Sequence, residues 1–235
     1  VMSSTLKIHE ALITIQEKMD RAIERSGRRA DTVKLMAVSK FHTIEEILAA
    51  ADEGLMLFGE NRVQEACEKF PSIMHKHPQI QLHMIGSLQR NKVKSIVPLA
   101  SCIQSVDRLE LIEEIQKQAH KNDKIIDILL EYHTGEESKS GFTNENELYK
   151  ALDLLSETTH LNPRGFMTMA PFTKDEQAIR ASFRKLRMMQ EKAQKLFSHF
   201  TLNELSMGMS NDYEIAIEEG STLIRVGTAL FGSRE

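Results

Sequence analysis

The stretch Leu35-Met36-Ala37-Val38-Ser39-Lys40 decides the fold. Its four leading apolar residues run without a break, which is typical of a strand buried on both faces. Thr43 then opens a helical pattern that carries two glutamates in its first turn. A buried strand followed at once by a helix is the unit of α/β folds. Lys40 falls at the carboxyl end of the strand, where these folds keep their active sites.

Lys40 has two interpretations from this stretch alone. An amine at the end of a buried strand is partly desolvated, and a neutral amine attacks an aldehyde or ketone to form a Schiff base. A solvated lysine that only ends a strand is the commoner occurrence. The residues further along the chain favour the first interpretation.

The same alternation of strand and helix continues through the chain. After the first strand, expected at 34–39, seven short apolar segments are expected as strands at 55–58, 81–85, 102–107, 125–131, 164–169, 202–205 and 222–226. Eight strands that alternate with helices through short connections predict a single (β/α)8 barrel, with residues 1–235 forming one domain. An open doubly wound sheet is the main alternative, but the first strand is not followed by its Gly-x-Gly-x-x-Gly turn.

Three details of the expected helices can be checked against a structure. A long amphipathic helix is expected over 5–26. A helix from about Arg62 is expected to end at Phe70, because Pro71 follows. Asn211 and Glu214 have the spacing of a capping box for the helix after the seventh strand. The apolar stripe of the first helix consists of Leu6, Ile13, Ile15, Met19 and Ile23.

Composition narrows the class of protein. The chain has 235 residues and a net charge of −4, which argues against a dedicated nucleic-acid binder. There is no membrane-length apolar run and no signal-peptide core, and the cysteines Cys67 and Cys102 are isolated, so a cytoplasmic protein is expected. His75 and His77 lack a nearby third ligand, which favours a loop over a metal site.

In a barrel all the strand ends meet at one mouth. Lys40 ends the first strand, Asn61 follows the second, and His83 and Met167 lie toward the ends of the third and sixth, where both are candidates to line a pocket. Barrels often hold a phosphate group between the loops after strands seven and eight. Those loops here are 206–210, with two hydroxyls and a glycine, and Gly227-Thr228-Ala229. They predict a phosphate site, although each alone could be ordinary turn chemistry.

A lysine that forms imines and a phosphate site in one mouth suggest two kinds of ligand. One is pyridoxal 5′-phosphate (PLP), and the other is the sugar phosphate of a Schiff-base aldolase. Arg225 lies on the last strand, where alternation could turn it inward. Since arginine stays protonated and only donates, it suits an unprotonated pyridine nitrogen. The extra acid–base groups that an aldolase would want are not evident.

Seven motifs, in the same order and over nearly the whole chain, resemble the family of pyridoxal phosphate homeostasis proteins. They are residues 37–40 (AVSK), 58–61 (FGEN), 85–92 (IGSLQRNK), 135–141 (GEESKSG), 167–171 (MTMAP), 205–210 (LSMGMS) and 225–232 (RVGTALFG). The resemblance implies a barrel like the N-terminal domain of alanine racemase, with PLP as a Schiff base on Lys40. Arg225 would face the pyridine nitrogen and Asn61 would lie beside the ring. The phosphate would be held by Ser210, Gly227 and Thr228, with Ser206 nearby.

Two residues depart from the pattern expected of the family. Arg62 follows Asn61 where an aromatic residue is expected, and Leu82 precedes His83 where a tryptophan or similar residue is expected. Both departures are expected to alter the lining of the mouth. Neither removes a group assigned to the cofactor.

The primary interpretation is a carrier that binds PLP reversibly, with little or no catalysis, and serves intracellular PLP (vitamin B6) homeostasis. Apo forms of PLP enzymes are possible acceptors, and a monomer is expected. A racemase-type PLP enzyme of low activity is the alternative. It would need a second acid–base residue, which alanine racemases take from a further domain, and Tyr132 is the one tyrosine near a strand end. A third class is an interaction protein for which the cofactor is only a signal.

Overall fold

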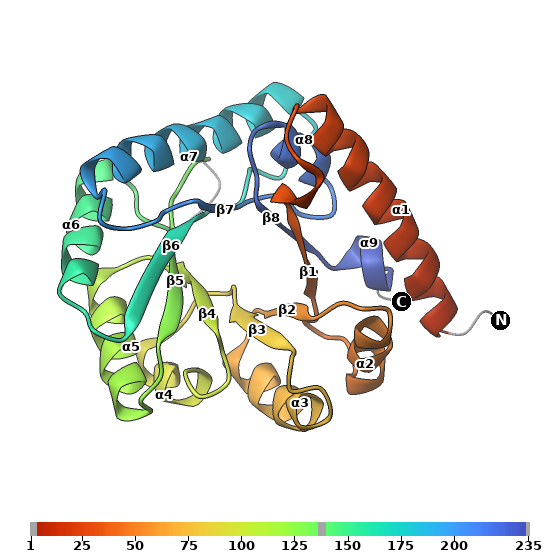
Figure 1. Cartoon of the computed structure of the whole chain (residues 1–235), viewed down its shortest axis with the longest axis horizontal. Helices are drawn as coiled ribbons and strands as arrows, with labels where there is room; N and C mark the ends of the chain where they lie inside the picture. Colours follow the sequence, from red (N-terminus) through yellow and green to blue (C-terminus); the bar gives the residue numbers. More distant parts are fainter. Residues whose placement is uncertain (1–3, 136–139, 234–235) are drawn as a thin grey trace.

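The computed structural model describes residues 4–135 and 140–233. Residues 136–139, which belong to the predicted motif at 135–141, lie outside the described residues. Eight parallel strands form a closed barrel in chain order, and the helices surround it (Figure 1). The barrel predicted from the sequence is therefore confirmed.

The strands are short and evenly distributed along the chain. They are β1 (Lys34–Val38), β2 (Leu57–Glu60), β3 (Gln81–Met84), β4 (Cys102–Val106), β5 (Ile126–Glu131), β6 (Leu161–Met167), β7 (Glu204–Ser206) and β8 (Leu223–Val226). The barrel closes where β8 pairs with β1, with Met36 opposite Arg225. This closure brings the first strand end, which carries Lys40, next to the last.

The helices alternate with these strands. They are α1 (Ser4–Arg25), α2 (Ile44–Asp52), α3 (Val63–Lys76), α4 (Val93–Ile96), α5 (Leu109–Lys121), α6 (Glu145–Ser156), α7 (Glu176–Leu196), α8 (Tyr213–Glu218) and α9 (Thr228–Phe231), with 3-10 turns at Ala30–Thr32 and Arg90–Lys92. The N-terminus of α2 is closed by a capping box between Thr43 and Glu46. In the described part of the chain no helix is both long and apolar enough to cross a membrane.

Each strand separates two apolar layers, because successive side chains point to opposite faces. In β1, Ala37 belongs to the large core between the strands and the helices, whereas Met36 and Val38 belong to a small cluster inside the barrel. This alternation determines which residues of a strand can reach the mouth.

Three predictions about the helices are wrong in detail. The first concerns the apolar stripe of α1. Leu6 and Ile13, which were predicted to be buried, are each 47% exposed. The helix buries Ile8 and Ala22 together with the remaining predicted residues, because the face that packs on the barrel is rotated from the predicted stripe.

The second concerns the end of α3. Pro71 lies inside this helix, which continues to Lys76. Phe70 and Ile73 are fully buried on either side of Pro71, so packing outweighs the lost backbone hydrogen bond.

The third wrong prediction is the capping box at Asn211 and Glu214. Helix α8 begins at Tyr213, so Asp212 occupies the cap position. The Asp212 carboxylate accepts a hydrogen bond from the backbone N–H of Met209 at 2.7 Å and makes no side-chain cap. Asp212 therefore stabilises the loop after β7 instead of the helix.

Candidate functional site

A pocket at the carboxyl ends of the strands contains both Lys40 and Arg225. Its lining residues are Val38, Lys40, Asn61, Ile85, Met167, Met169, Met209, Ser210, Asn211, Arg225, Gly227 and Thr228. They come from the ends of β1, β2, β3, β6 and β8 and from the loops that follow β7 and β8. The structure thus brings together most of the residues predicted for the site.

The loop that carries Lys40 is held by Lys69 of α3, a lysine that is only 8% exposed. Its ammonium donates hydrogen bonds to the carbonyl oxygens of Ser39, at 2.9 Å, and His42, at 3.2 Å. It also makes ion pairs with Glu60, at 2.6 Å, and Glu65, at 2.8 Å. A single buried cation thereby fixes the backbone on both sides of Lys40.

Phe41, directly after Lys40, adopts a left-handed backbone conformation with φ of 65°. Such a conformation is strained for a residue with a side chain and persists where the surroundings enforce it. The Phe41 N–H donates to the Glu65 carboxylate at 2.7 Å, and the Arg62 guanidinium lies 5.3 Å from the ring centroid. The direction of the Lys40 side chain is therefore set by an enforced turn.

Asn61 supplies a hydrogen-bonding group to the same pocket. Its Oδ1 atom is buried and has no hydrogen-bond partner among the described residues. The segment after β3 approaches closely here, since a Cβ atom on Gly86 would lie 2.1 Å from the Asn61 carbonyl oxygen. Only glycine fits at that place. Buried polar atoms normally have a hydrogen-bond partner, so this acceptor could receive a hydrogen bond from a bound polar ligand.

Arg225 is only 3% exposed. Its guanidinium donates to the Ser206 hydroxyl at 2.7 Å and to the Thr168 carbonyl oxygen at 2.9 Å. Burial lowers its pKa to about 10, opposed by the carboxylates of Asp212 and Glu131. Arg225 is therefore a cation at neutral pH. Two of its donors are used by Ser206 and Thr168, and the remaining donors are available to the pocket.

The loops after β7 and β8 contact one another at the mouth. The Ser210 hydroxyl accepts a hydrogen bond from the backbone N–H of Ala229 at 3.2 Å. Gly208 O accepts from the Arg225 N–H at 2.9 Å. Hydroxyls and the N-terminal turn of α9 thus lie side by side, as expected for a site that receives an anion.

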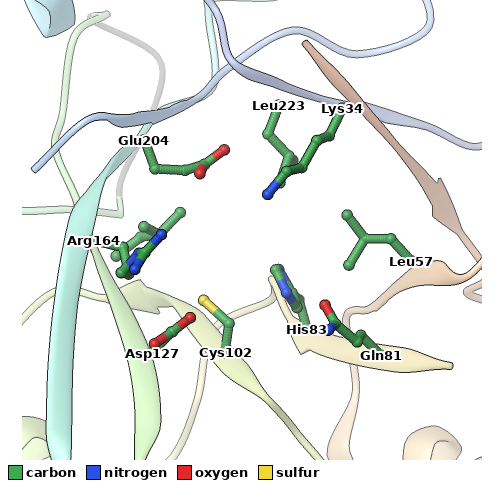
Figure 2. Close-up of a pocket in the computed structure, with 10 residues that line it drawn as sticks. Lys34, Leu57, Gln81, His83, Cys102, Asp127, Arg164, Glu204 and Leu223 are labelled. Atoms are coloured by element: carbon green, nitrogen blue, oxygen red, sulfur yellow. The ribbon is translucent and has the colours of Figure 1, made fainter. Parts of the chain in front are cut away.

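Two of the predicted residues lie outside this pocket. Ser206 is fully buried behind Arg225 and bonds to it. His83 lines a different pocket, at the amino ends of the strands, because Ile85, directly after β3, takes the inward position nearer the mouth. Figure 2 shows that pocket, where Lys34, Asp127, Arg164 and Glu204 converge with His83 from different strands.

The two departures from the family pattern do not line the Lys40 pocket either. Leu82 is fully buried in the core between the strands and the helices, on the face opposite to His83. Arg62 stacks over Phe41. The expectation that both alter the lining of the mouth is wrong for Leu82, because its strand position points it outward.

The sequence reasoning missed Lys69 and Glu131. Glu131 ends β5 and is 5% exposed. Burial raises its pKa from 4.5 to about 7, helped by Asp107 and opposed by a hydrogen bond with Ser140 and by Arg225. Its Oε2 atom has no hydrogen-bond partner in the described residues. A carboxylate at the end of a strong apolar run was the signal available in the sequence.

Tyr132, the tyrosine considered for acid–base chemistry, lies outside the mouth. It packs in the outer core, with the Lys185 ammonium 5.7 Å from its ring centroid. It is not among the residues that line the Lys40 pocket. In the described ranges no three histidine, cysteine or carboxylate side chains are grouped to hold a metal ion.

Comparison with known proteins agrees with this geometry. The model of the alanine racemase N-terminal domain family matches residues 14–235. A pyridoxal phosphate homeostasis protein of Aquifex aeolicus is 40% identical over 96% of this chain and 98% of its own length. The mouse pyridoxal phosphate homeostasis protein is 31% identical over the whole chain and 89% of its own length.

Solved structures show the same relationship. PipY of Synechococcus elongatus, solved with PLP bound, superposes with a TM-score of 0.84 at 33% identity, covering 96% of this chain and 100% of that one. Alanine racemase of Streptomyces coelicolor has a TM-score of 0.67 at 17% identity, covering 93% of this chain and 58% of its own, and shares the fold. The chain belongs to the family of pyridoxal phosphate homeostasis proteins and is built on the barrel of the alanine racemase N-terminal domain.

Proposed function

We propose that this protein binds PLP reversibly through a Schiff base on Lys40 and serves as a carrier in PLP homeostasis. The observation that carries the proposal is that one pocket is lined by Lys40, by Arg225 and by the loops after β7 and β8 that contain Ser210 and Thr228. An amine, a permanent donor and an anion site at one mouth match the aldehyde, ring nitrogen and phosphate of PLP. The names of the relatives and the PLP-bound PipY structure support the assignment.

Each group of the ligand has a counterpart in the chain. Ser210, Gly227 and Thr228 would hold the phosphate with hydroxyls and backbone N–H groups. Arg225 would donate to the ring nitrogen, and Asn61, whose Oδ1 has no partner among the described residues, would lie beside the ring. When bound, PLP supplies an aldehyde for the amine and a ring that accepts electrons, most strongly when its nitrogen is protonated. A donor-only arginine opposes that protonation, as it does in racemases of the alanine type, so the arginine alone does not separate carrier from enzyme.

The absorbance spectrum of the protein reconstituted with PLP tests this proposal. We expect a yellow band that borohydride removes, and we expect no such band in Lys40→Ala. Lys150→Ala, which alters an exposed lysine on α6, should keep the band. A wild-type protein that stays colourless after reconstitution would overturn the assignment and would leave a sugar phosphate as the ligand class.

Carrier and racemase differ in proton exchange. We expect negligible exchange of the α-proton of amino acids in deuterated water, because Tyr132 packs outside the pocket. Nuclear magnetic resonance of the amino acid measures this directly. Rapid exchange that disappears in Lys40→Ala would instead establish a PLP enzyme. In a carrier, apo forms of PLP enzymes would be the acceptors, and transfer of colour to such an enzyme would report it.

A further inference from the structure

A chain of hydrogen bonds runs through the barrel interior from the Lys40 pocket to the pocket at the other end. Arg225 Nη1 lies 2.7 Å from Ser206 Oγ, and Ser206 Oγ lies 2.6 Å from Gln104 Oε1. Gln104 Nε2 then lies 2.9 Å from His83 Nδ1. Arg225 lines the first pocket and His83 lines the second, which Figure 2 shows. Ser206 and Gln104, the two middle residues, are fully buried.

The chemistry of Arg225 determines the direction of every bond in this chain. A guanidinium only donates, so Ser206 accepts from it and gives its own single proton to Gln104. The Gln104 amide therefore presents its oxygen to Ser206 and its N–H to His83. His83 Nδ1 must accept that hydrogen bond, which places the ring proton on Nε2. All of these hydrogen bonds can form together only when His83 is neutral.

The surroundings of His83 keep it neutral. Burial, together with the positive charge of Lys34 in the same pocket, lowers its pKa to about 4. Arg164, Asp127 and Glu204 are the other charged residues that line this pocket. At physiological pH the imidazole is thus in the form that the direction of the hydrogen bonds requires.

We propose that Gln104 is a positioning residue for PLP, which holds the Arg225 guanidinium in place through Ser206 while neutral His83 fixes its amide. This inference rests on the proposed function. The two donations of Arg225, to the Ser206 hydroxyl and the Thr168 carbonyl, orient the plane of the guanidinium. Without Gln104, the Ser206 hydroxyl would lose its acceptor and could rotate away. Arg225 would then face the pyridine nitrogen from a less defined position.

Gln104→Leu tests the inference by removing the hydrogen bonds while keeping a side chain of similar size. We expect its dissociation constant for PLP to rise up to about tenfold, as for the loss of one neutral hydrogen bond. We also expect the pH at which the bound cofactor changes its absorbance to move upward, because Arg225 opposes protonation of the ring less well. Gln118→Leu is the matched control. Gln118 is buried on α5 and bonds to Glu114, and it takes no part in the hydrogen bonds that connect Arg225 to His83.

Gln104→Glu provides a rescue. A carboxylate still accepts from Ser206, so we expect PLP binding near that of the wild type. It cannot donate to His83, so the ring proton should move from Nε2 to Nδ1. Nitrogen resonances of the histidine ring, measured in the protein without PLP, report this change. In the wild type we expect Nδ1 unprotonated.

The outcomes separate the two proposals. If the wild type does not bind PLP, the proposed function fails. If the wild type and Gln104→Leu bind PLP equally, with the same pH profile, only this inference fails. A protonated Nδ1 in the wild type would also overturn it. Should Gln104→Leu not fold, Gln104→Glu and Ser206→Ala remain, and Ser206→Ala is expected to weaken PLP binding as Gln104→Leu does.

Discussion

Lys69→Met is expected to lower the free energy of unfolding by about 3 to 5 kcal/mol, the range for removing one partner of a buried ion pair. Glu60 is fully buried, and Lys69 is its cationic partner at 2.6 Å. Without the ammonium, the Glu60 carboxylate would keep the Ser39 hydroxyl as its donor, at 2.8 Å, but would lose the charge that balances it. Two backbone carbonyls beside Lys40 would lose a donor at the same time.

Urea denaturation of Lys69→Met and the wild type at neutral pH measures this effect. Lys150→Met is the matched control, because Lys150 pairs with Glu147 on the exposed side of α6, and such a pair contributes at most about 1 kcal/mol. Adding Glu60→Gln to Lys69→Met should recover part of the loss, since the buried carboxylate that lost its cationic partner is then replaced by a neutral amide. A free energy of unfolding for Lys69→Met within about 1 kcal/mol of the wild type would contradict the argument.

Glu131→Gln is expected to stabilise the protein at pH 8 by about 3 kcal/mol, the free energy that corresponds to a carboxyl pKa raised from 4.5 to about 7. A group whose pKa is higher in the folded state contributes stability below its unfolded pKa. That contribution is lost as the pH rises through the folded pKa. For Glu131 the window therefore runs from about pH 4.5 to pH 7. Glutamine has nearly the same shape and carries no charge to desolvate.

The difference in unfolding free energy between Glu131→Gln and the wild type, measured at several pH values, tests this prediction. It should be large at pH 8 and should vanish near pH 4.5. Glu113→Gln, which changes an exposed side chain of α5, serves as the control for the loss of one charge. An advantage of Glu131→Gln that is equal at pH 5 and pH 8 would show that Glu131 does not titrate in this window.

The barrel and much of the site could be predicted because both depend on alternation along the chain. Unbroken apolar runs at regular spacing locate the strands, and the residue at each strand end belongs to the common mouth. Lys40, Asn61, Ser210, Arg225 and Thr228 are of this kind. Their positions follow from local sequence and from the closure of the sheet.

Other features of the site depend on how deep in the barrel a residue lies and on contacts between residues far apart in the chain. Local sequence encodes neither. Alternation predicts that His83 points inward but not that it lies one layer below Ile85. The helical period locates α1, but the neighbouring helices decide which of its faces is buried. In the sequence Lys69 looks like an ordinary polar residue of a helix. Its structural role comes from the carbonyl oxygens of Ser39 and His42, which only the folded chain brings close to it.

The pairing of β8 with β1 also has a meaning for the timing of biosynthesis. Lys40 leaves the ribosome well before Arg225, yet they share one pocket that forms only when the barrel closes. A nascent chain that has emerged as far as β7 has the amine without the guanidinium and without the Gly227–Thr228 turn. The complete pocket is therefore a property of the closed barrel, and a chain synthesised only as far as β7 does not yet present it to the cofactor.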